Sequence, residues 1–180
     1  DEIGMEDVRI PAHKIQDPPA VNQPEIAHIV GRDPERTPMQ WDASANAGFS
    51  APTVEDLWLP IAQDYQEKNV ARELKDPHSF LHFYRRLMAT RKASPALVVG
   101  SYRSLQTSPA ETLETCFVYE RQTDDQRMIV ALNFTDQDQK LGLPNPAKGR
   151  IMLSTLLDRE EEIDLSEFTL RANEGCIILL

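Results

Sequence analysis

The sequence has few cysteines, few glycines and a shortage of positive charge. Among 180 residues there are two cysteines and seven glycines, and 19 Lys and Arg stand against 29 Asp and Glu, for a net charge of −10. A nucleic acid or an anionic membrane surface needs a basic partner face, so this balance argues against both. A neutral ligand is compatible with it.

The two cysteines also limit the metal and redox chemistry that the chain can support. Cys116 and Cys176 form no short metal-ligand spacing, and both stand in apolar, strand-like runs. We therefore expect buried free thiols, no metal and no cofactor, and we take free thiols as an indication of a reducing, cytoplasmic compartment. No apolar run reaches the roughly 18 to 20 residues of a membrane helix, so no membrane partner is expected.

The most unusual stretch is Gly31–Asp42, followed by Asn46–Ser50. It combines two prolines, two arginines, a methionine and a tryptophan, so we expect a loop folded onto the protein. A guanidinium held beside a carboxylate can be presented to a hydroxyl-rich or anionic ligand. Alternatively, the charged residues of this stretch simply pair with each other and pin the loop: Arg32, Asp33, Arg36 and Asp42.

The block Arg36–Trp41 reads Arg-Thr-Pro-Met-Gln-Trp, with Arg32-Asp33 before it. It resembles a highly specific segment of bacterial alpha-glucosidases and oligo-1,6-glucosidases, in the alpha-amylase superfamily of glycoside hydrolases (family 13). Similarity covers most of the chain and continues at eight further places: Trp58–Ile61, Asn69-Val70, Asp76–Ser79, Tyr84–Leu87, Gly100–Tyr102, Ala131–Phe134, Leu153–Thr155 and Asn173–Gly175.

The resemblance implies an α+β fragment of a longer enzyme. Asp1–Met5 resembles the end of the last strand region of a (β/α)₈ barrel, so this chain is expected to be the C-terminal part of the protein. Residues 1–95 would supply the long loop after strand 8 and the final helix of the catalytic barrel. Residues 96–180 would form an antiparallel all-β sandwich domain. The rest of the barrel is then the expected protein partner.

The residue pattern predicts the same order of elements. Residues 1 to about 60 hold more than half of the 13 prolines, so regular structure should be sparse there. A short helix is expected over Asn69–Lys75, with Asn69 as its N-cap. A longer helix is expected from Asp76 as cap and Pro77 as first residue to Ser94, with an apolar stripe that packs on the barrel.

After Pro95, short β-rich runs alternate with turn residues, which predicts an antiparallel sandwich. Asp124-Asp125 is the expected hairpin turn between the second and third runs, and the acidic stretch Glu160–Glu162 is expected to be a solvated loop. The predicted strands are Val98–Leu105, Thr115–Gln122, Met128–Phe134, Gln139–Leu143, Arg150–Ser154, Phe168–Arg171 and Cys176–Leu180.

No catalytic residue is assigned within the chain. Retaining glycoside hydrolysis needs two carboxyl groups about 5 Å apart, and in the family resembled these groups follow earlier barrel strands. What the resemblance carries over is substrate binding. Arg36 matches an arginine that reaches the sugar in the innermost subsite, whereas Arg32 and Asp33 are expected to hold the loop. Trp41 is expected to be a buried anchor of the loop, with stacking on a sugar as the alternative.

The segment Ile10–Pro18 also resembles the family, but it departs from the pattern at one position. Relatives often carry Glu where this chain has His13, and that residue lines the pocket. His13 is therefore a candidate substrate-binding residue whose identity puts the linkage preference in doubt. The alternative is an exposed loop histidine with no role in binding.

The leading hypothesis is the C-terminal segment of a retaining, exo-acting alpha-glucosidase. Such an enzyme would hydrolyse, and in part transglucosylate, short alpha-glucosides such as maltose. Trehalose synthases and sucrose isomerases are alternatives within the superfamily. A relative without catalytic activity, with a binding or scaffold role, is the alternative that is not an enzyme. The 180 residues alone are expected to be inactive, because they carry one barrel helix and no nucleophile.

Overall fold

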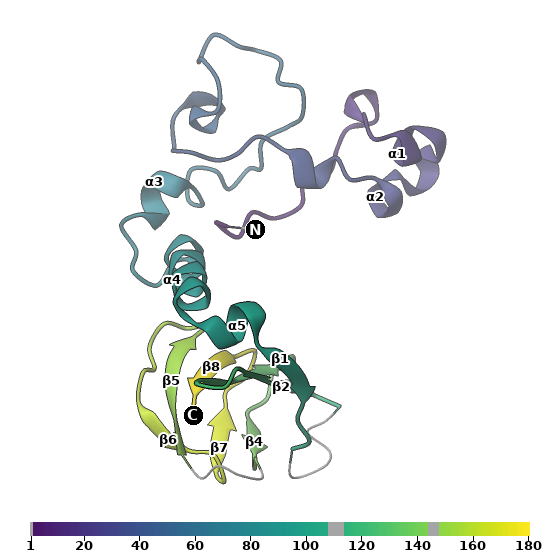
Figure 1. Ribbon diagram of the computed structural model, residues 1–180. Coiled ribbons are helices and arrows are strands. Elements are labelled where there is room, and N and C mark those ends of the chain that lie inside the picture. The colour runs from purple at the N-terminus through teal and green to yellow at the C-terminus, as the bar shows by residue number, and fades with distance from the viewer. Residues whose placement is uncertain (1, 108–113, 144–147) are drawn as a thin grey trace. The chain divides into compact units, whose positions relative to one another are not determined.

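The computed structural model describes residues 2–107, 114–143 and 148–180 (Figure 1). It divides into two compact units, Asp1–His82 and Phe83–Leu180. The first unit is built from short helical turns and loops, and the second carries the β-strands. This order agrees with the predicted α+β class, while the domain assignment of 1–95 to a barrel and 96–180 to a β domain stays a prediction.

The first unit has little regular structure, as the proline content predicts. Its helical segments span at most five residues each, and the chain between them is irregular. In η4 the backbone of Asn46 and Ala47 is left-handed rather than helical. The segments are η1 (Ala12–Lys14), α1 (Pro18–Asn22), η2 (Pro24–Ile26), α2 (Ala27–Val30), η3 (Pro34–Arg36), η4 (Ala45–Gly48) and α3 (Val70–Glu73).

Helix α3 begins as predicted. Asn69 has extended backbone angles, and its side-chain oxygen accepts a hydrogen bond from the N–H of Arg72 at 2.9 Å. This is the geometry of an N-cap, in which a side chain satisfies an amide that the helix itself leaves unpaired. The side-chain amide of Asn69 also donates to the carbonyl of Tyr65, at 2.8 Å, and so anchors the preceding turn.

The long helix α4 spans Phe80–Ala93 and starts three residues later than predicted. Asp76 is not its cap, because its carboxylate accepts from the N–H of His78 and closes a local turn. Ser79 takes the capping position, with its hydroxyl 3.4 Å from the N–H of His82. Aspartate side chains often make such local turns, and here that preference won over helix capping.

The segment after α4 corrects a second prediction. Pro95 starts another short helix, α5 (Pro95–Val99), with Pro at its first position where the missing N–H costs nothing. Val98 and Val99 were predicted as the start of a strand, but they end this helix. β-branched side chains favour strands, but this preference is weak and is outweighed here by the helical turn that Pro95 starts. The first strand, β1, therefore begins at Ser101.

The second unit holds a six-stranded sheet in the order β1-β2-β3-β8-β5-β6 and a two-stranded sheet of β4 and β7, with every paired neighbour antiparallel. The predicted turn at Asp124-Asp125 is confirmed, since Gln122 of β2 pairs with Arg127 of β3. The strands are β1 (Ser101–Ser104), β2 (Cys116–Gln122), β3 (Arg127–Asn133), β4 (Gln139–Leu141), β5 (Lys148–Ser154), β6 (Glu162–Asp164), β7 (Phe168–Leu170) and β8 (Gly175–Leu179).

Strand β6 was not predicted. Glu162 ends the acidic stretch that was expected to be a solvated loop, and it pairs with Arg150 at the edge of the sheet. Its side chain is exposed, as expected. A three-residue edge strand with polar residues on both sides of Ile163 carries too little alternation to be recognised from sequence.

Apolar side chains fill both faces of the large sheet. Because side chains alternate along a strand, Ile129 and Ala131 of β3 face one core and Met128 and Val130 face another. The first core is shared with Leu141, Phe168 and Leu170 of the small sheet, which makes the predicted sandwich. The second core lies under Leu97 of α5 together with Phe83 and Leu87 of α4.

Both cysteines are free and buried in the sandwich core, which confirms the prediction of buried thiols. Burial raises the pKa of Cys116 and raises the pKa of Cys176 to about 12. A thiol rather than a thiolate is therefore present at neutral pH, and these groups are poor nucleophiles and poor metal ligands.

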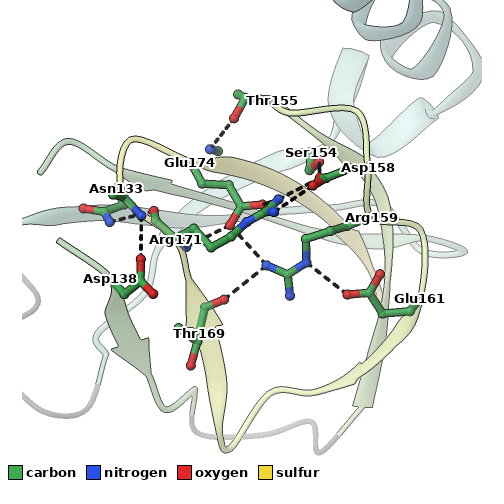
Figure 2. A network of polar contacts seen from close by, with 12 residues as sticks. Asn133, Asp138, Ser154, Thr155, Asp158, Arg159, Glu161, Thr169, Arg171 and Glu174 are labelled. Atoms are coloured by element: carbon green, nitrogen blue, oxygen red, sulfur yellow. Dashed lines mark hydrogen bonds and ion pairs between the residues drawn. The ribbon is translucent and has the colours of Figure 1, made fainter. Parts of the chain in front are cut away.

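A buried carboxylate, Glu174, organises one end of the sandwich (Figure 2). Its side chain is fully buried, and it accepts from Nη1 of Arg159 at 3.1 Å, from Nη2 of Arg171 at 2.6 Å and from the backbone N–H of Arg171 at 2.8 Å. Arg171 also binds Asp158 through two contacts of 2.7 Å. Burial alone would raise the pKa of Glu174, but the hydrogen bonds from Arg171 outweigh it and hold that pKa below its usual value.

Candidate substrate-binding loop

The loop Gly31–Asp42 is tied to the preceding segment through Asp33. Its carboxylate is buried, and Oδ2 accepts hydrogen bonds from the backbone N–H groups of Gln16 at 2.7 Å and Asp17 at 3.0 Å. Pro34 then starts the short turn η3, which ends at Arg36. Asp33 therefore holds the loop, as predicted. It also fixes the position of the turn from which the side chain of Arg36 extends.

Arg36 lies against two buried carboxylates. Its Nη1 donates to Oδ1 of Asp17 at 2.8 Å and is 3.7 Å from Oδ1 of Asp33. The side chains of Asp17 and Asp33 are 5% and 2% exposed, whereas that of Arg36 is 43% exposed. The guanidinium is thus oriented from one side by buried charge and open to solvent on another.

This arrangement suits recognition of a neutral polar ligand. A guanidinium carries five N–H donors in a rigid plane, and only Nη1 makes the two contacts just described. Two carboxylates and one guanidinium sum to one negative charge, which disfavours an anionic ligand. Hydroxyl groups of a neutral ligand can accept from the exposed donors at no such cost.

If the charged residues of the loop only paired with each other to hold it in place, Arg32 and Asp42 should also form ion pairs with Asp33 or Arg36, and they do not. Arg32 lies 3.4 Å from Glu35, and both side chains are well exposed. Asp42 accepts from the hydroxyl and the N–H of Ser44 rather than from an arginine, and these hydrogen bonds lower its pKa. Of the expected mutual pairs, only Arg36 with Asp33 is formed.

A hollow of about 850 Å³ lies beside this loop in the first unit. Its wall is formed by the segments around residues 7–15, 20–31 and 33–34, and it includes Asp33 and His28. A volume of this order is typical of small-molecule sites. Within the described residues, neither Arg36 nor His13 belongs to its wall.

His13 lies in the turn η1 and its side chain is exposed. The same turn carries Lys14, which forms an ion pair with Asp56 and donates to the carbonyl of Leu57 at 2.5 Å. The hydrogen bond and charge of Lys14 lower the pKa of Asp56, and His13 contributes a weaker lowering effect. The structure therefore places His13 at the surface and does not bring it together with Arg36.

The second half of the motif is anchored by Gln40 and not by Trp41. Gln40 is fully buried, and its side-chain amide donates to the carbonyl of Lys68 at 2.8 Å. Trp41 is half exposed, so the expectation of a buried anchor is wrong for this residue. Nε2 of Gln40 donates to a backbone carbonyl inside the fold, whereas its buried Oε1 has no hydrogen-bond partner within the described residues, and the next side chain points outward.

The segment Asn46–Ser50 forms a tight left-handed turn. Asn46, Ala47 and Gly48 all have positive φ angles of 53° to 66°. The carbonyl of Ala47 accepts from the N–H groups of both Trp41 and Asp42, and the amide of Asn46 donates to two carbonyls further on. The turn thereby closes the motif loop on itself.

Gly48 is the position in this turn that tolerates a side chain least. A Cβ on Gly48 would lie 2.7 Å from the carboxylate of Asp42, and φ is +66°. We expect Gly48→Ala to lower the free energy of unfolding of the first unit by about 1 to 3 kcal/mol, from left-handed strain and crowding. Urea titration followed by tryptophan fluorescence measures this, because both tryptophans, Trp41 and Trp58, belong to that unit.

Two variants separate the causes of this loss. Asn tolerates left-handed angles, so Gly48→Asn should recover part of the stability if backbone strain dominates and none if the contact with Asp42 dominates. Ala51→Ser, at an exposed position after the turn, should leave the midpoint unchanged. Equal midpoints for Gly48→Ala and the parent would contradict the prediction.

Comparison with known proteins shows to which family the chain belongs. The model of the alpha-amylase catalytic domain matches residues 1–100. The chain belongs to the alpha-amylase family. It is 33% identical over 195 residues to an oligo-1,6-glucosidase of Parageobacillus thermoglucosidasius, covering 97% of this chain and 33% of that protein. It is 32% identical over 168 residues to a probable alpha-glucosidase of Rhizobium meliloti, covering 91% of this chain and 28% of that protein.

A solved structure of similar fold is the trehalulose synthase MutB from Pseudomonas mesoacidophila MX-45. It matches with a TM-score of 0.81 and 28% identity, over 99% of this chain and 34% of MutB. This confirms the predicted order of a helical part followed by an antiparallel β domain. The alpha-amylase family chain thus spans about one third of the length of the relatives it matches.

Sequence reasoning missed the contribution of Asp17 to this loop. No catalytic role is assigned to Asp17 from the sequence, and the structure buries its carboxylate against Arg36. A signal was present in the sequence, because Asp17 and Asp33 each precede a proline that starts a helical turn. The pairing itself depends on a fold that brings together residues 19 positions apart, which a local sequence pattern does not encode.

The chain shows no group that could hold a metal within its described residues, and no helix in that part is long and apolar enough to span a membrane.

Proposed function

We propose that this chain is the C-terminal segment of a retaining, exo-acting alpha-glucosidase that acts on short alpha-glucosides such as maltose. In this proposal the segment supplies a substrate-binding arginine and a scaffold, and an upstream barrel supplies the catalytic carboxylates. The similarity to an oligo-1,6-glucosidase and a probable alpha-glucosidase supports the substrate class.

The observation that carries the proposal is the setting of Arg36. Its guanidinium is half exposed, and the buried carboxylates of Asp17 and Asp33 orient it. Oδ2 of Asp17 and Oδ1 of Asp33 have no hydrogen-bond partner within the described part of the chain. These oxygens are buried, so they hold the guanidinium, and the exposed N–H donors of Arg36 are the groups that match the hydroxyls of glucose, since each hydroxyl can accept a hydrogen bond.

The role of Arg36 is to position the sugar rather than to react. Retaining hydrolysis proceeds through a covalent glycosyl-enzyme formed by one carboxylate while a second acts as acid and then as base. Hydrogen bonds from Arg36 to the glucose hydroxyls would hold the anomeric carbon in line with the nucleophile. Binding energy of this kind lowers the barrier because it fixes the reacting geometry.

His13 is proposed to contribute to the outer part of the substrate site. It is exposed and lies on a turn of the same unit as Arg36. An imidazole in place of a carboxylate changes the hydrogen bonds offered to a second sugar. We therefore propose that His13 influences linkage preference and not the chemistry of cleavage.

The test is release of 4-nitrophenol from its alpha-glucoside, measured on two forms with their intact masses. The 180-residue chain, of 20.4 kDa, is expected to show no turnover above the uncatalysed rate. A longer form that includes an upstream barrel should turn over, at the roughly 1 to 1,000 per second of ordinary enzymes. Turnover by the 180 residues alone, or an inactive longer form with intact carboxylates, would refute the proposal.

A second candidate is isomerisation of sucrose. The similarity to trehalulose synthase MutB favours it, because that match is of comparable identity to those with the glucosidases. Product analysis with sucrose separates the two: isomerised disaccharide indicates the synthase, whereas glucose and fructose alone indicate hydrolysis. A longer form that binds sugars but transforms neither substrate would instead indicate a non-catalytic binding relative.

A further inference from the structure

The first backbone N–H groups of helix α3 donate to the end of the motif loop. The N–H of Val70 donates to the carbonyl of Gln40 at 3.0 Å. The N–H of Ala71 donates to the carbonyl of Trp41, also at 3.0 Å. A helix cannot pair its first N–H groups itself, so these groups need acceptors from elsewhere in the chain. The last two residues of the block Arg36–Trp41 supply them here.

Asn69 fixes the position at which α3 begins, and with it the direction of these two donors. Its backbone is extended, and its side-chain oxygen accepts from the N–H of Arg72 at 2.9 Å. Its side-chain amide donates to the carbonyls of Tyr65 at 2.8 Å and Gln66 at 3.3 Å. Asn69 is 2% exposed, so these contacts are shielded from water. The helix therefore starts from a fixed point.

The side chain of Gln40 makes a third contact with the same part of the chain. Gln40 is fully buried, and its Nε2 donates at 2.8 Å to the carbonyl of Lys68, the residue just before Asn69. Three hydrogen bonds thus join residues 40–41 to residues 68–71. This is the anchor of the motif loop at its C-terminal end.

Arg36 lies between two anchors of the loop. Asp33 holds the N-terminal end through two backbone N–H groups of the preceding segment, and Gln40 belongs to the C-terminal anchor. Pro38 restricts the chain between Arg36 and Gln40, because its ring fixes φ. A segment that is short, stiff and held at both ends keeps the guanidinium against Asp17, at 2.8 Å. Release of one end would let it move.

We propose that Asn69 is a positioning residue for the substrate site: it holds the start of α3 against Gln40 and Trp41, and so keeps Arg36 in place. The inference rests on the proposed function, since Arg36 binds the sugar only in that proposal. Asn69 acts through the backbone of the loop and does not contact substrate. Displacement of a binding group by about 1 Å can reduce the rate by about 100-fold, even when the mutated residue is far from the chemistry.

Asn69→Ala removes the cap of α3, and Ser79→Ala is its matched control. Ser79 caps the neighbouring helix α4 in the same way, with its hydroxyl 3.4 Å from the N–H of His82. That hydroxyl also donates to the carbonyl of Glu73, and it makes no hydrogen bond to the motif loop within the described residues. Both variants lose a helix cap, which costs a similar amount of stability. Only Asn69→Ala also releases the loop.

The kinetic test uses the longer form and 4-nitrophenyl alpha-glucoside. Asn69→Ala should have a kcat/KM about 10-fold lower than Ser79→Ala, with most of the loss in kcat, because a misplaced sugar reacts slowly. Asn69→Ser should recover most of this loss, since Ser caps a helix about as well as Asn. Equal kcat/KM in Asn69→Ala and Ser79→Ala would overturn the proposal, because lost helix stability alone would then explain both.

Amide hydrogen exchange in the 180-residue chain gives a second readout that needs no turnover. The N–H groups of Arg36 and Trp41 are hydrogen-bonded to backbone carbonyls of the first unit, at 3.0 Å and 2.8 Å. Both should exchange about 10-fold faster in Asn69→Ala, through local opening of the loop. Both should keep the parent rate in Ser79→Ala. Unchanged exchange in Asn69→Ala would overturn the proposal whatever the kinetics show.

The two readouts separate this inference from the proposed function. If the parent longer form shows no turnover but the two amides respond, the glucosidase proposal fails and the anchoring of Arg36 by Asn69 stands. If circular dichroism shows that Asn69→Ala does not fold, Gln40→Met replaces it in both tests. That change keeps a side chain of similar size and removes only the donor to the carbonyl of Lys68.

Discussion

Glu174→Gln is expected to lower the free energy of unfolding of the β-rich unit by about 3 kcal/mol, the lower part of the range for breaking a buried ion pair. The fully buried carboxylate of Glu174 is the common partner of Arg159 and Arg171. Gln keeps the shape and part of the hydrogen bonding but removes the charge. Two partly exposed guanidiniums are then left without the buried charge that they share.

The loss is partial because each arginine keeps another partner. Arg171 retains Asp158, and Arg159 retains Glu161 and its position 5.2 Å from the ring centre of Phe168. Figure 2 shows these contacts converging from the loop after β5 and the turn before β8. The network therefore joins two segments that are distant in sequence.

Urea titration followed by far-ultraviolet circular dichroism measures this effect, since both tryptophans lie in the other unit. Glu167→Gln is the matched control: it makes the same change on an exposed glutamate of the same unit and should shift stability by no more than about 0.5 kcal/mol. A Glu174→Gln protein as stable as the control would show that the network contributes nothing net.

The same network predicts acid sensitivity. Hydrogen bonds from Arg171 lower the pKa of Asp158 to about 2, from an ordinary 3.8, and the pKa of Glu174 also lies below its usual 4.5. A depressed folded-state pKa contributes stability above the unfolded value that is lost as pH falls through the folded value. Stability should therefore decline between about pH 4.5 and pH 2, and less steeply in Glu174→Gln.

Arg36→Ala, in a longer form that carries the catalytic barrel, is expected to reduce kcat/KM for an alpha-glucoside by about 100- to 1,000-fold. This is the usual effect of removing one preorganised donor near reacting atoms. Arg36 is oriented by two buried carboxylates, so its donors need no reorganisation when substrate binds. The loss should appear in kcat as well as KM, because misplaced substrate reacts slowly.

Removal of Arg36 also leaves Asp17 and Asp33 buried side by side, so folding must be checked. Arg36→Lys keeps the positive charge and loses the planar fork, and it should restore stability more than activity. Arg72→Ala, on an exposed residue of α3, is the matched control and should leave both unchanged. Full activity in a folded Arg36→Ala protein would show that Arg36 does not bind the substrate.

The sequence predicts this fold well where pattern and packing coincide. Short β-rich runs between turn residues identified β2 and β3 and the turn at Asp124-Asp125. Alternate residues of β2 are buried, whereas β3 is buried along most of its length because both faces of the sheet are covered. Prediction from sequence failed where one side chain can either close a turn or cap a helix. Asp76 closes a turn and leaves capping of α4 to Ser79, and both residue types suit either role.

The role of Arg36 in substrate binding stays a prediction, and the construction of its surroundings was not predicted. The motif identified Arg36 through resemblance, whereas the buried carboxylate of Asp17 is brought to it only by the fold. Trp41 was expected to be the buried anchor of the loop, with stacking on a sugar as the alternative, yet Gln40 is the buried residue. An amide with a specific backbone acceptor can be buried as readily as an aromatic ring, and sequence alone does not reveal the acceptor.

The position of β8 in the large sheet has a consequence for biosynthesis. This last strand of the chain lies between β3 and β5, so β5 and β6 join the rest of the sheet only through it. During translation, β1 to β3 and β5 to β6 must wait as separate pieces with uncovered edges until residues 175–179 have left the ribosome. Truncation before residue 175 would therefore divide the sheet and leave the edges of β3 and β5 uncovered.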